Sequence, residues 1–286
     1  MKENKAPVSY VASVARFLRQ FLETQQRIDY AHFVTKGETR TGAPIQKLIN
    51  LCLDPREITE EIFQKVYVSI SLSGTLEPIE AYKALTGIEK RQNQTLTLPS
   101  PYQKENILTL VIDNISSKLA DRTPENFKKI IDVIEGVVAG TPKNVGIFCA
   151  SYAILDNLLK NGLQQRLSKP LFIAYQGMES NENDRLIESF KDESLKQGGV
   201  LLSVLGGRSS EGSDYPAEQM HSVIVVGIPY AKPTPSIQAT IEYLETEFPG
   251  KGREFGYHIP ALTRASQAAG RPIRSLEDYA VVVLAD

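Results

Sequence analysis

The stretch "NVGIFCASYAILDNLLKNG", residues 144–162, decides how the rest of the chain is interpreted, because it joins an apolar run to a helical pattern. Residues 144–150 are almost uninterruptedly apolar, which is typical of a strand buried on both faces. Ser151 stands where a helix N-cap is favoured, and Gly162 stands where a helix ends. The stretch therefore predicts a buried strand followed directly by a helix.

The same alternation continues on both sides of this stretch. Thr123-Pro124 predicts a helix start and Gly140 its end. The apolar face of that helix comprises Phe127, Ile130, Ile131, Ile134 and Val138. Strands are predicted at "PLFIAY", "VLLSV", "HSVIVVGIP" and "YAVVVLAD", and helices at "NENDRLIESFKDESLKQGG", 236–247 and 260–270. Short apolar strands that alternate with amphipathic helices predict an α/β fold, in which helices cover both faces of a parallel sheet.

The N-terminal third is less regular. Residues 8–25 carry an apolar stripe at helical spacing, which predicts an amphipathic helix with its core elsewhere in the fold. The stripe comprises Val11, Val14, Ala15, Leu18, Phe21 and Leu22. A connection rich in Gly, Thr and Pro is expected near 37–44. The segment "KVYVSISLSGTLEP" predicts a buried strand from Lys65 to Leu72, followed by a Ser-Gly-Thr turn.

Composition excludes several classes of protein. The formal charge is −2 and 42% of the 286 residues are apolar, so a full core is expected and there is no bulk basic excess. Cys52 and Cys149 have no second thiol at CxxC spacing, and three scattered histidines form no paired motif, so no metal site is expected. The start "MKENKAPVSY" has no apolar signal region, and no apolar run is long enough to cross a membrane.

Four loops are candidates for chemistry, and all four are expected at the carboxyl ends of strands, where parallel sheets bind ligands. They are Ser73–Leu76, Ser151–Tyr152, Gly206–Asp214 and Gln267–Arg274. The third contains Gly206, Gly207 and Gly212. It is either a nest of main-chain N–H groups that binds an anion or a corner that is rich in glycine for steric reasons alone. Ser151 has no nucleophile elbow around it, so an N-cap is favoured over a nucleophile.

The fourth loop has the strongest chemical pattern. If its first part is helical, Gln267, Gly270, Arg271 and Arg274 share one face at i, i+3, i+4 and i+7. Two guanidiniums beside an amide suit a polyanion such as a nucleoside triphosphate, whereas the alternative is a solvated basic face. The chain has neither a GxxxxGK[ST] phosphate loop nor a GxGxxG fingerprint, so a dehydrogenase is disfavoured.

In order along the chain, these loops resemble the later motifs of superfamily 2 helicases of the XPD family and its bacterial DinG relatives. "SISLSGTLEPIEAYKALTGI" resembles motif III, and "NVGIFCASY" resembles motif IV. "LLSVLGGRSSEGSDYPAEQMHSVIVVGIPY" resembles motif V, and "ASQAAGRPIRSLEDYAVVVLAD" resembles motif VI. The resemblance covers roughly residues 10–286. It implies a complete second RecA-like motor domain at 91–286, preceded by a partly helical remnant of the first motor domain at 1–90.

The resemblance also implies roles for individual residues. Arg271 and Arg274 would reach the triphosphate of ATP as arginine fingers, with Gln267 orienting a phosphate or the attacking water. Nucleotide binding and its coupling to DNA would involve Gly207, Glu211, Gly212, Asp214 and Gly270. Ser73, Gly74 and Thr75 would transmit closure between the motor domains. Ser151, Tyr152 and Arg208 would lie on the path of the single-stranded DNA backbone.

The sequence departs from the family pattern in several respects. Pro272 predicts that the helix ends near Arg271, so that a turn places Arg274. Ser213 replaces a more usual Ile. The Walker A lysine, the D-E-A-H box and the four iron-sulfur cysteines are absent from these 286 residues. ATP and Mg²⁺ would therefore be bound mainly by an N-terminal helicase half that precedes this segment, and an iron-sulfur cluster is expected only in the full-length protein.

The resemblance implies the C-terminal motor part of a 5′ to 3′ DNA helicase that acts in nucleotide excision repair, with the isolated chain inactive as an ATPase. The alternative is a non-catalytic module, either a degenerate helicase domain or a docking platform for repair proteins. The three intact motif VI side chains argue against degeneration. The protein is expected in the cytoplasm of a prokaryote or the nucleus of a eukaryote.

Overall fold

The computed structural model describes residues 9–39 and 42–286, which divide into two compact units. One unit comprises the chain up to Gln94 together with Lys232–Tyr257, and the other comprises Thr95–Ala231 and His258–Asp286. We call them the N-terminal unit and the sheet unit, and describe each by itself. The domain boundary near residue 90 stays a prediction, but the N-terminal unit also takes up a segment from the C-terminal third of the chain.

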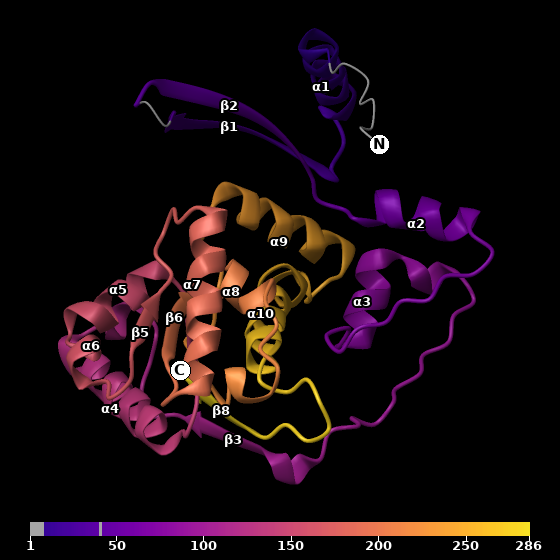
Figure 1. The fold of residues 1–286 in the computed structure, drawn as a ribbon. Coiled ribbons are helices and arrows are strands. Elements are labelled where there is room, and N and C mark those ends of the chain that lie inside the picture. Colours follow the sequence, from indigo (N-terminus) through magenta and orange to yellow (C-terminus); the bar gives the residue numbers. More distant parts are fainter. Residues whose placement is uncertain (1–8, 40–41) are drawn as a thin grey trace, which may run out of the picture. The chain divides into compact units, whose positions relative to one another are not determined.

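The sheet unit is built on six parallel strands in the order β3-β8-β7-β4-β6-β5 (Figure 1). These strands are β3 (Ile107–Ile112), β4 (Val145–Cys149), β5 (Leu171–Ile173), β6 (Val200–Val204), β7 (Ser222–Val226) and β8 (Ala280–Ala285). In the central strand β4, Ile147 lies opposite Leu202 of β6 and Ile224 of β7. Every residue of β4, β6 and β7 is buried, as the unbroken apolar runs predict.

Helices cover both faces of this sheet, which confirms the predicted fold class (Figure 1). The sheet unit's helices are α4 (Pro124–Gly140), α5 (Tyr152–Lys160), α6 (Leu163–Arg166), α7 (Ser180–Asp192), α8 (Arg208–Glu211) and α10 (Ile259–Ala269). Ile147 packs in a cluster with Ile134 of α4 and Leu158 of α5. The next residue, Phe148, packs in a second cluster with Phe190 of α7 and Ala268 of α10. The two-residue period of β4 therefore sends successive side chains to opposite layers.

The helix starts follow the sequence closely. Thr123 caps α4 by accepting a hydrogen bond from Asn126 N, and the five predicted apolar-face residues are the buried residues of that helix. Ser151 caps α5 by accepting from Ile154 N at 3.4 Å, which confirms the N-cap prediction. The edge strand β3 was not predicted. Two of its apolar side chains, Leu108 and Val111, are 54% and 68% exposed, although the sequence of the strand, ILTLVI, is almost continuously apolar.

The N-terminal unit begins with α1 (Tyr10–Thr24), which confirms the predicted amphipathic helix, although residue 8 lies outside the described residues. It continues through the antiparallel pair β1 (Tyr30–Glu38) and β2 (Pro44–Cys52), α2 (Arg56–Lys65) and α3 (Ile79–Thr86), and it includes α9 (Pro235–Glu247). The predicted connection near 37–44 includes the tip of this hairpin, whose two strands were not predicted; residues 40–41 lie outside the described residues. Within this unit Val11, Val14, Leu18 and Leu22 of α1 are exposed, so the apolar stripe is not covered by a core.

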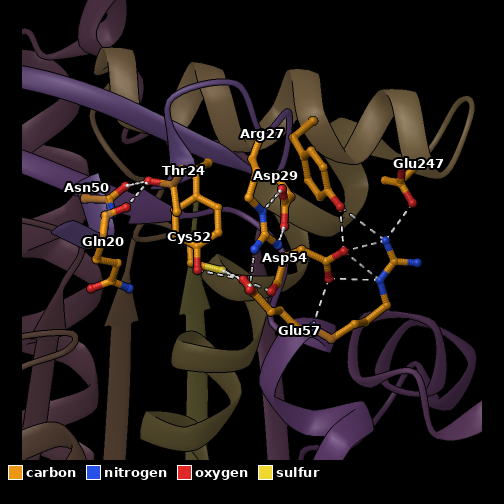
Figure 2. A network of polar contacts seen from close by, with 12 residues as sticks. Gln20, Thr24, Arg27, Asp29, Asn50, Cys52, Asp54, Glu57 and Glu247 are labelled. Carbon is orange, nitrogen blue, oxygen red and sulfur yellow. Dashed lines mark hydrogen bonds and ion pairs between the residues drawn. The ribbon is translucent and has the colours of Figure 1, made fainter. Parts of the chain in front are cut away.

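A polar network holds α9 to the segment that follows β2 (Figure 2). Arg56 Nε donates to Asp54 Oδ1 at 2.9 Å, and Arg56 Nη2 lies 2.6 Å from Glu247 Oε2. Tyr243 OH donates to Asp54 Oδ2. Partial burial acts to raise the pKa of Asp54, but the hydrogen bonds from Arg56 and Tyr243 outweigh it and lower that pKa. The carboxylate is therefore kept ionised between two donors.

The predicted strand from Lys65 to Leu72 is wrong. Lys65 ends α2 and the residues that follow form neither helix nor strand. Val68, Ile70 and Leu72 are 69%, 81% and 84% exposed. A strand needs a neighbouring strand to satisfy its main-chain groups, and within the described residues no strand pairs with this segment.

Candidate functional site

The loop between β6 and β7, residues 205–221, is folded back on itself and fixed to the sheet unit. Gly206 has φ of +77°, a left-handed conformation that favours glycine. Gly207 precedes the short helix α8, and its amide donates to Val204 O at 3.3 Å. Tyr215 is fully buried, and its hydroxyl donates to Ser209 O at 2.8 Å. The middle of the loop is therefore held by buried hydrogen bonds.

Arg271 is one of the residues that hold this loop in place. Its Nε donates to Ser210 O at 2.8 Å and its Nη1 donates to Ser213 O at 2.5 Å. The residue is 8% exposed, and this burial lowers the pKa of Arg271 from its ordinary value. Nη1 also lies 3.7 Å from Asp214 Oδ1. The guanidinium thus joins the segment after α10 to the loop after β6.

Arg274 contacts the same loop from a more open position. Its Nε lies 3.2 Å from Asp214 Oδ1, and the two side chains are 37% and 77% exposed. Its main-chain N–H, like that of Ser275, donates to Asp278 Oδ2 at 2.7 Å. Partial burial opposes ionisation of Asp278, but these hydrogen bonds lower its pKa. The turn that carries Arg274 is therefore held by a carboxylate that was not predicted from the sequence.

Gly270, Arg271 and Arg274 do not lie on one helical face with Gln267, because the helix ends before them. The helix α10 ends at Ala269 with Gly270 as its C-cap, as the position of Pro272 predicts. A turn, not a fourth helical position, brings Arg274 to Asp214. Gln267 lies in the last turn of α10 and is exposed, with no side-chain hydrogen bond among the described residues. A Cβ on Gly270 would lie no closer than 3.5 Å to any neighbour, so close packing does not require glycine there.

The remaining residues of the third loop lie at its exposed end. Glu211, the last residue of α8, and Gly212 are both exposed. A Cβ on Gly212 would lie 3.1 Å from Arg208 O, which favours glycine at this position. The loop therefore presents Glu211, Gly212 and Asp214 on the surface, next to the buried part of the same loop.

A cavity of about 210 Å³ opens at the carboxyl ends of β4, β5 and β6. Tyr152, Gly207 and Arg208 are among the residues that line it. Ser151, which immediately precedes Tyr152, caps α5 and does not line this cavity. Arg208 Nε lies 3.1 Å from Asp184 Oδ1 of α7. The structure thus brings together two of the three residues expected along a DNA path.

Two of the four candidate loops do not lie at the carboxyl ends of strands, so that prediction is wrong for them. Gln267–Arg274 comes before β8 and follows α10, on the amino side of the strand. Ser73, Gly74 and Thr75 belong to the N-terminal unit and follow the segment that forms no strand. Ser73 Oγ lies 3.0 Å from Thr75 Oγ1 and accepts from Thr75 N at 3.2 Å, so the Ser-Gly-Thr turn is present.

No group of three or more His, Cys, Asp or Glu side chains in residues 9–39 and 42–286 is placed to hold a metal ion. Within the same residues, no helix is both long and apolar enough to cross a membrane.

Comparison with known proteins identifies the family. The model of the helicase C-terminal domain matches residues 134–286, which include the loop after β6, Arg271 and Arg274. The chain belongs to the helicase C-terminal domain family. Its resemblance to XPD-type helicases is thereby confirmed at the level of the family.

Relatives and solved structures agree with this assignment. The chain is 25% identical over 252 residues to the XPD/RAD3 helicase subunit of general transcription and DNA repair factor IIH from Saccharomyces cerevisiae, covering 82% of this chain and 32% of that protein. It is 29% identical over 237 residues to a probable ATP-dependent helicase of Methanocaldococcus jannaschii, covering 77% of this chain and 34% of the relative. A structure described as an XPD helicase superposes with a TM-score of 0.66 at 22% identity, covering 96% of this chain and 47% of that chain.

These matches establish the fold and show how much of each protein is similar. The superposition confirms the RecA-like helicase motor-domain fold of the sheet unit. The chain spans about a third of the length of the curated relatives. The activities in their names are therefore statements about much longer proteins.

Three contact residues of the sheet unit were not singled out from the sequence. Asp278 follows "RSLE" and resembles an ordinary surface acid. Asp184 and Asn183 lie on α7, where Asn183 is 8% exposed and shares the buried face of the helix with Ile187 and Phe190. A polar residue at an apolar position of an amphipathic helix was the signal that could have identified Asn183.

Proposed function

We propose that this chain is the C-terminal motor part of an ATP-dependent DNA helicase of XPD type, and that it supplies Arg274 to ATP and a backbone path to single-stranded DNA. The observation that carries the proposal is the double contact between the two arginines and the loop after β6. Arg271 donates to Ser210 O and Ser213 O, while Arg274 pairs with Asp214. One rigid connection therefore links the basic segment to the Gly-rich loop.

The two arginines have different parts in this proposal. Arg271 is enclosed by main-chain acceptors, so it serves as the link that keeps the loop and the basic segment together. Arg274 is more exposed and has one surface carboxylate as its ionic partner, which a triphosphate can displace. Arg274 is therefore the arginine finger, and Gln267, exposed on the last turn of α10, orients a phosphate or the attacking water.

The coupling step follows from the position of Asp214. When a triphosphate attracts Arg274, Asp214 loses the nearer of its two arginine partners and keeps Arg271 Nη1 at 3.7 Å, so the charge balance at the exposed end of the loop changes. Arg208 begins α8 in the same loop and lines the cavity beside Tyr152. Nucleotide binding at Arg274 is thus transmitted through Asp214, Gly212 and Glu211 to the residues proposed to hold DNA. Ser73, Gly74 and Thr75, in the N-terminal unit, are proposed to take part in closure of the motor.

ATP hydrolysis also needs groups that these 286 residues do not encode. The sequence has no GxxxxGK[ST] loop to hold the β- and γ-phosphates and no D-E-A-H box to hold Mg²⁺. We propose that an N-terminal helicase half supplies both and also carries the iron-sulfur cluster. Participation in nucleotide excision repair, 5′ to 3′ movement and the cellular location belong to the same proposal, and the name of the XPD/RAD3 relative supports the repair assignment.

The test is ATP hydrolysis by the 286-residue chain, with and without single-stranded DNA, before and after addition of a polypeptide that contains the family's phosphate loop and metal-binding acids. The expected result is no hydrolysis alone and DNA-stimulated hydrolysis on mixing. Arg274→Ala is expected to lower the mixed rate by about 10³-fold, as arginine fingers do. Arg253→Ala, which removes an exposed guanidinium in the N-terminal unit, is the matched control and is expected to leave it unchanged.

One observation favours the alternative of a docking platform. The apolar stripe of α1 is exposed within the N-terminal unit, with Val11 and Leu22 at 80% and 66%. The hydrolysis experiment separates the two functions. If mixing yields no activity and the chain is indifferent to DNA, the motor proposal is wrong and the exposed helix becomes the better guide to function.

A further inference from the structure

The strand β3 ends the six-stranded sheet with one edge unpaired. Among the described residues β3 pairs with β8 alone, in a register that runs without a break from Ile107 opposite Ala280 to Ile112 opposite Ala285. The outer N–H and C=O groups of β3 therefore have no strand partner in this part of the chain. A row of such groups is a template on which another extended segment can pair.

β3 lacks the features by which edge strands usually prevent such pairing. Its sequence, ILTLVI, contains no charged residue and no proline, and the unbroken register with β8 excludes a bulge. Leu108 and Val111 are 54% and 68% exposed. An apolar, uncharged strand pairs readily with another strand when its edge is open. The composition of β3 thus favours a covered edge over a solvated one.

A groove of about 380 Å³ lies beside this edge, between β3, β8 and α4. Leu110 and Ile112 line it from β3, and Gly136 and Gly140 line it from α4. A Cβ on either glycine would meet no atom within 4 Å, so α4 leaves this part of the sheet open. Leu108 belongs to the same face of β3, because side chains repeat every two residues along a strand. The apolar surface thus continues from the edge of the sheet into the groove.

The sequence of β3 is suited to pairing with itself. A two-fold axis perpendicular to the sheet makes two copies of an edge strand antiparallel and places side chains of the same face opposite each other. The axis then lies between two copies of the same residue. With the axis at Leu110, the two Leu110 side chains meet and Leu108 lies opposite Ile112 of the second copy. Every pair on the groove side is then apolar, which stabilises a pair of strands.

Charges next to the strand distinguish between the possible axes. With the axis at Thr109, Glu105 lies opposite Asp113 of the second copy, and two carboxylates that face each other are destabilising. With the axis at Leu110 this pair does not form, because Glu105 then lies opposite Ile115, beyond the end of β3. Axes further from the middle of the strand pair fewer of its residues. The pairing centred on Leu110 is therefore favoured.

We propose that two copies of this chain associate through antiparallel pairing of β3, with the two-fold axis at Leu110, so that their two sheets become one continuous sheet. The loop after β6 lies away from this interface, because β8, β7 and β4 separate β6 from β3 in the sheet. Self-association is therefore additional to the proposed function and leaves the candidate site accessible.

The first test is sedimentation velocity of the 286-residue chain at increasing concentration, in which the parent is expected to pass from monomer to dimer. Leu110→Lys places two ammonium groups opposite each other, so the dissociation constant of the dimer is expected to rise about tenfold. Leu110→Glu is expected to have the same effect. An equimolar mixture of the two variants is expected to restore the dimer, because opposite charges then meet. Leu262→Lys, on α10 of the sheet unit and 48% exposed, is the matched control and is expected to behave like the parent.

The second test is cysteine cross-linking, which reports the register and adds no charge to β3. Leu110→Cys is expected to form a disulfide between two copies on mild oxidation, because directly opposite residues of antiparallel strands have Cα atoms about 4.5–5.5 Å apart. Thr109→Cys and Val111→Cys are expected to form none, because diagonal pairs lie about 7–8 Å apart. The parent, which contains Cys52 and Cys149, gives the background.

Three outcomes would overturn the inference. A parent that stays monomeric up to about 100 μM would leave the edge of β3 to a strand of a different protein. A dimer that is unaffected by Leu110→Lys would have its interface elsewhere. Cross-linking of Thr109→Cys in preference to Leu110→Cys would show a different register. Circular dichroism identifies a misfolded lysine or glutamate variant, in which case the cysteine variants decide.

Discussion

Arg271 Nε donates a 2.8 Å hydrogen bond to the main-chain oxygen of Ser210, so the segment after α10 and the loop after β6 are fastened by a side chain that is almost fully buried. Such a contact differs from a surface ion pair, because its acceptors are main-chain oxygens that water cannot easily replace. Removal of the guanidinium would leave Ser210 O and Ser213 O without this donor.

The first prediction concerns the exchange of Arg271 for lysine. An ammonium group cannot reproduce the fork that reaches two carbonyl oxygens, so Arg271→Lys is expected to lower the free energy of unfolding by about 2 kcal/mol. Arg274→Lys, whose partner Asp214 is 77% exposed, is expected to change it by less than about 0.5 kcal/mol. Urea denaturation of the two variants measures the difference. Equal effects would show that burial does not distinguish the two arginines.

Much of the sheet unit could be predicted from the sequence because burial is expressed there as an unbroken apolar pattern. Phe127, Ile134 and Val138 were assigned to the core from helical spacing alone, and all three are buried. The edge strand β3 was missed although its sequence, ILTLVI, is a nearly unbroken apolar run like those of the predicted strands. The segment from Lys65 to Leu72 was predicted wrongly because apolar, β-branched composition indicates strand propensity, while a strand also requires a partner.

The candidate site was predicted in its residue types but not in its contacts. That two guanidiniums would lie close together followed from the positions of Arg271 and Arg274, and both approach Asp214; the binding of a polyanion there stays a prediction. That Arg271 would be tied to Ser210 and Ser213 depends on how a loop 58 and 61 residues earlier folds, which local patterns do not specify. Asn183 was missed because a single polar residue on an apolar helix face does not indicate a cavity until the residues on the opposite wall are known.

The second prediction concerns the network between Asp54, Arg56 and Glu247 in the N-terminal unit. Arg56 and Asp54 are 15% and 14% exposed, so Arg56→Ala leaves carboxylates with little solvent to replace the lost partner. The expected loss of unfolding free energy is about 2 kcal/mol, with faster amide hydrogen exchange in α9. Lys65→Ala removes an ion pair to Glu61 whose side chains are 70% and 63% exposed, and is expected to have almost no effect.

A double-mutant cycle makes this prediction specific. Combining Arg56→Ala with Glu247→Ala is expected to reveal a favourable coupling energy of about 1 kcal/mol. If the two losses of unfolding free energy simply add, the contact between Arg56 and Glu247 does not hold α9 in the N-terminal unit.

The third prediction concerns pH and His221. The imidazole is 6% exposed, its Nδ1 has no partner among the described residues, and burial lowers its pKa from the ordinary value of 6.5. Lys143 and Lys169 act in the same direction, whereas Glu218 and Asp278 oppose it. Because the unfolded chain then binds the proton more readily, stability is expected to fall as pH drops below about 6.5.

The measurement is the midpoint of urea unfolding between about pH 7.5 and 5.5, above the range where most carboxylates titrate. His221→Phe keeps an aromatic ring beside Tyr279, whose centroid lies 4.8 Å from that of the imidazole, and removes the titrating group. The variant is expected to have a flatter stability profile in this window. A profile as steep as that of the parent would assign the pH dependence to other groups.

The fourth prediction compares two glycines of the sheet unit with opposite backbone requirements. Gly206 has φ of +77°, so Gly206→Ala forces a side chain into a left-handed conformation at the start of the loop that carries Arg208 and Asp214. Gly136 lies inside α4, and a Cβ there would meet no atom within 4 Å. Gly206→Ala is expected to destabilise the protein by about 1 kcal/mol, and Gly136→Ala to stabilise it by about 0.5–1 kcal/mol. Thermal unfolding of both variants measures the two signs. A neutral effect of Gly206→Ala would show that the left-handed conformation of Gly206 does not hold the start of the loop in place. The proposed coupling between Arg274 and the loop through Asp214 would then lack a rigid support.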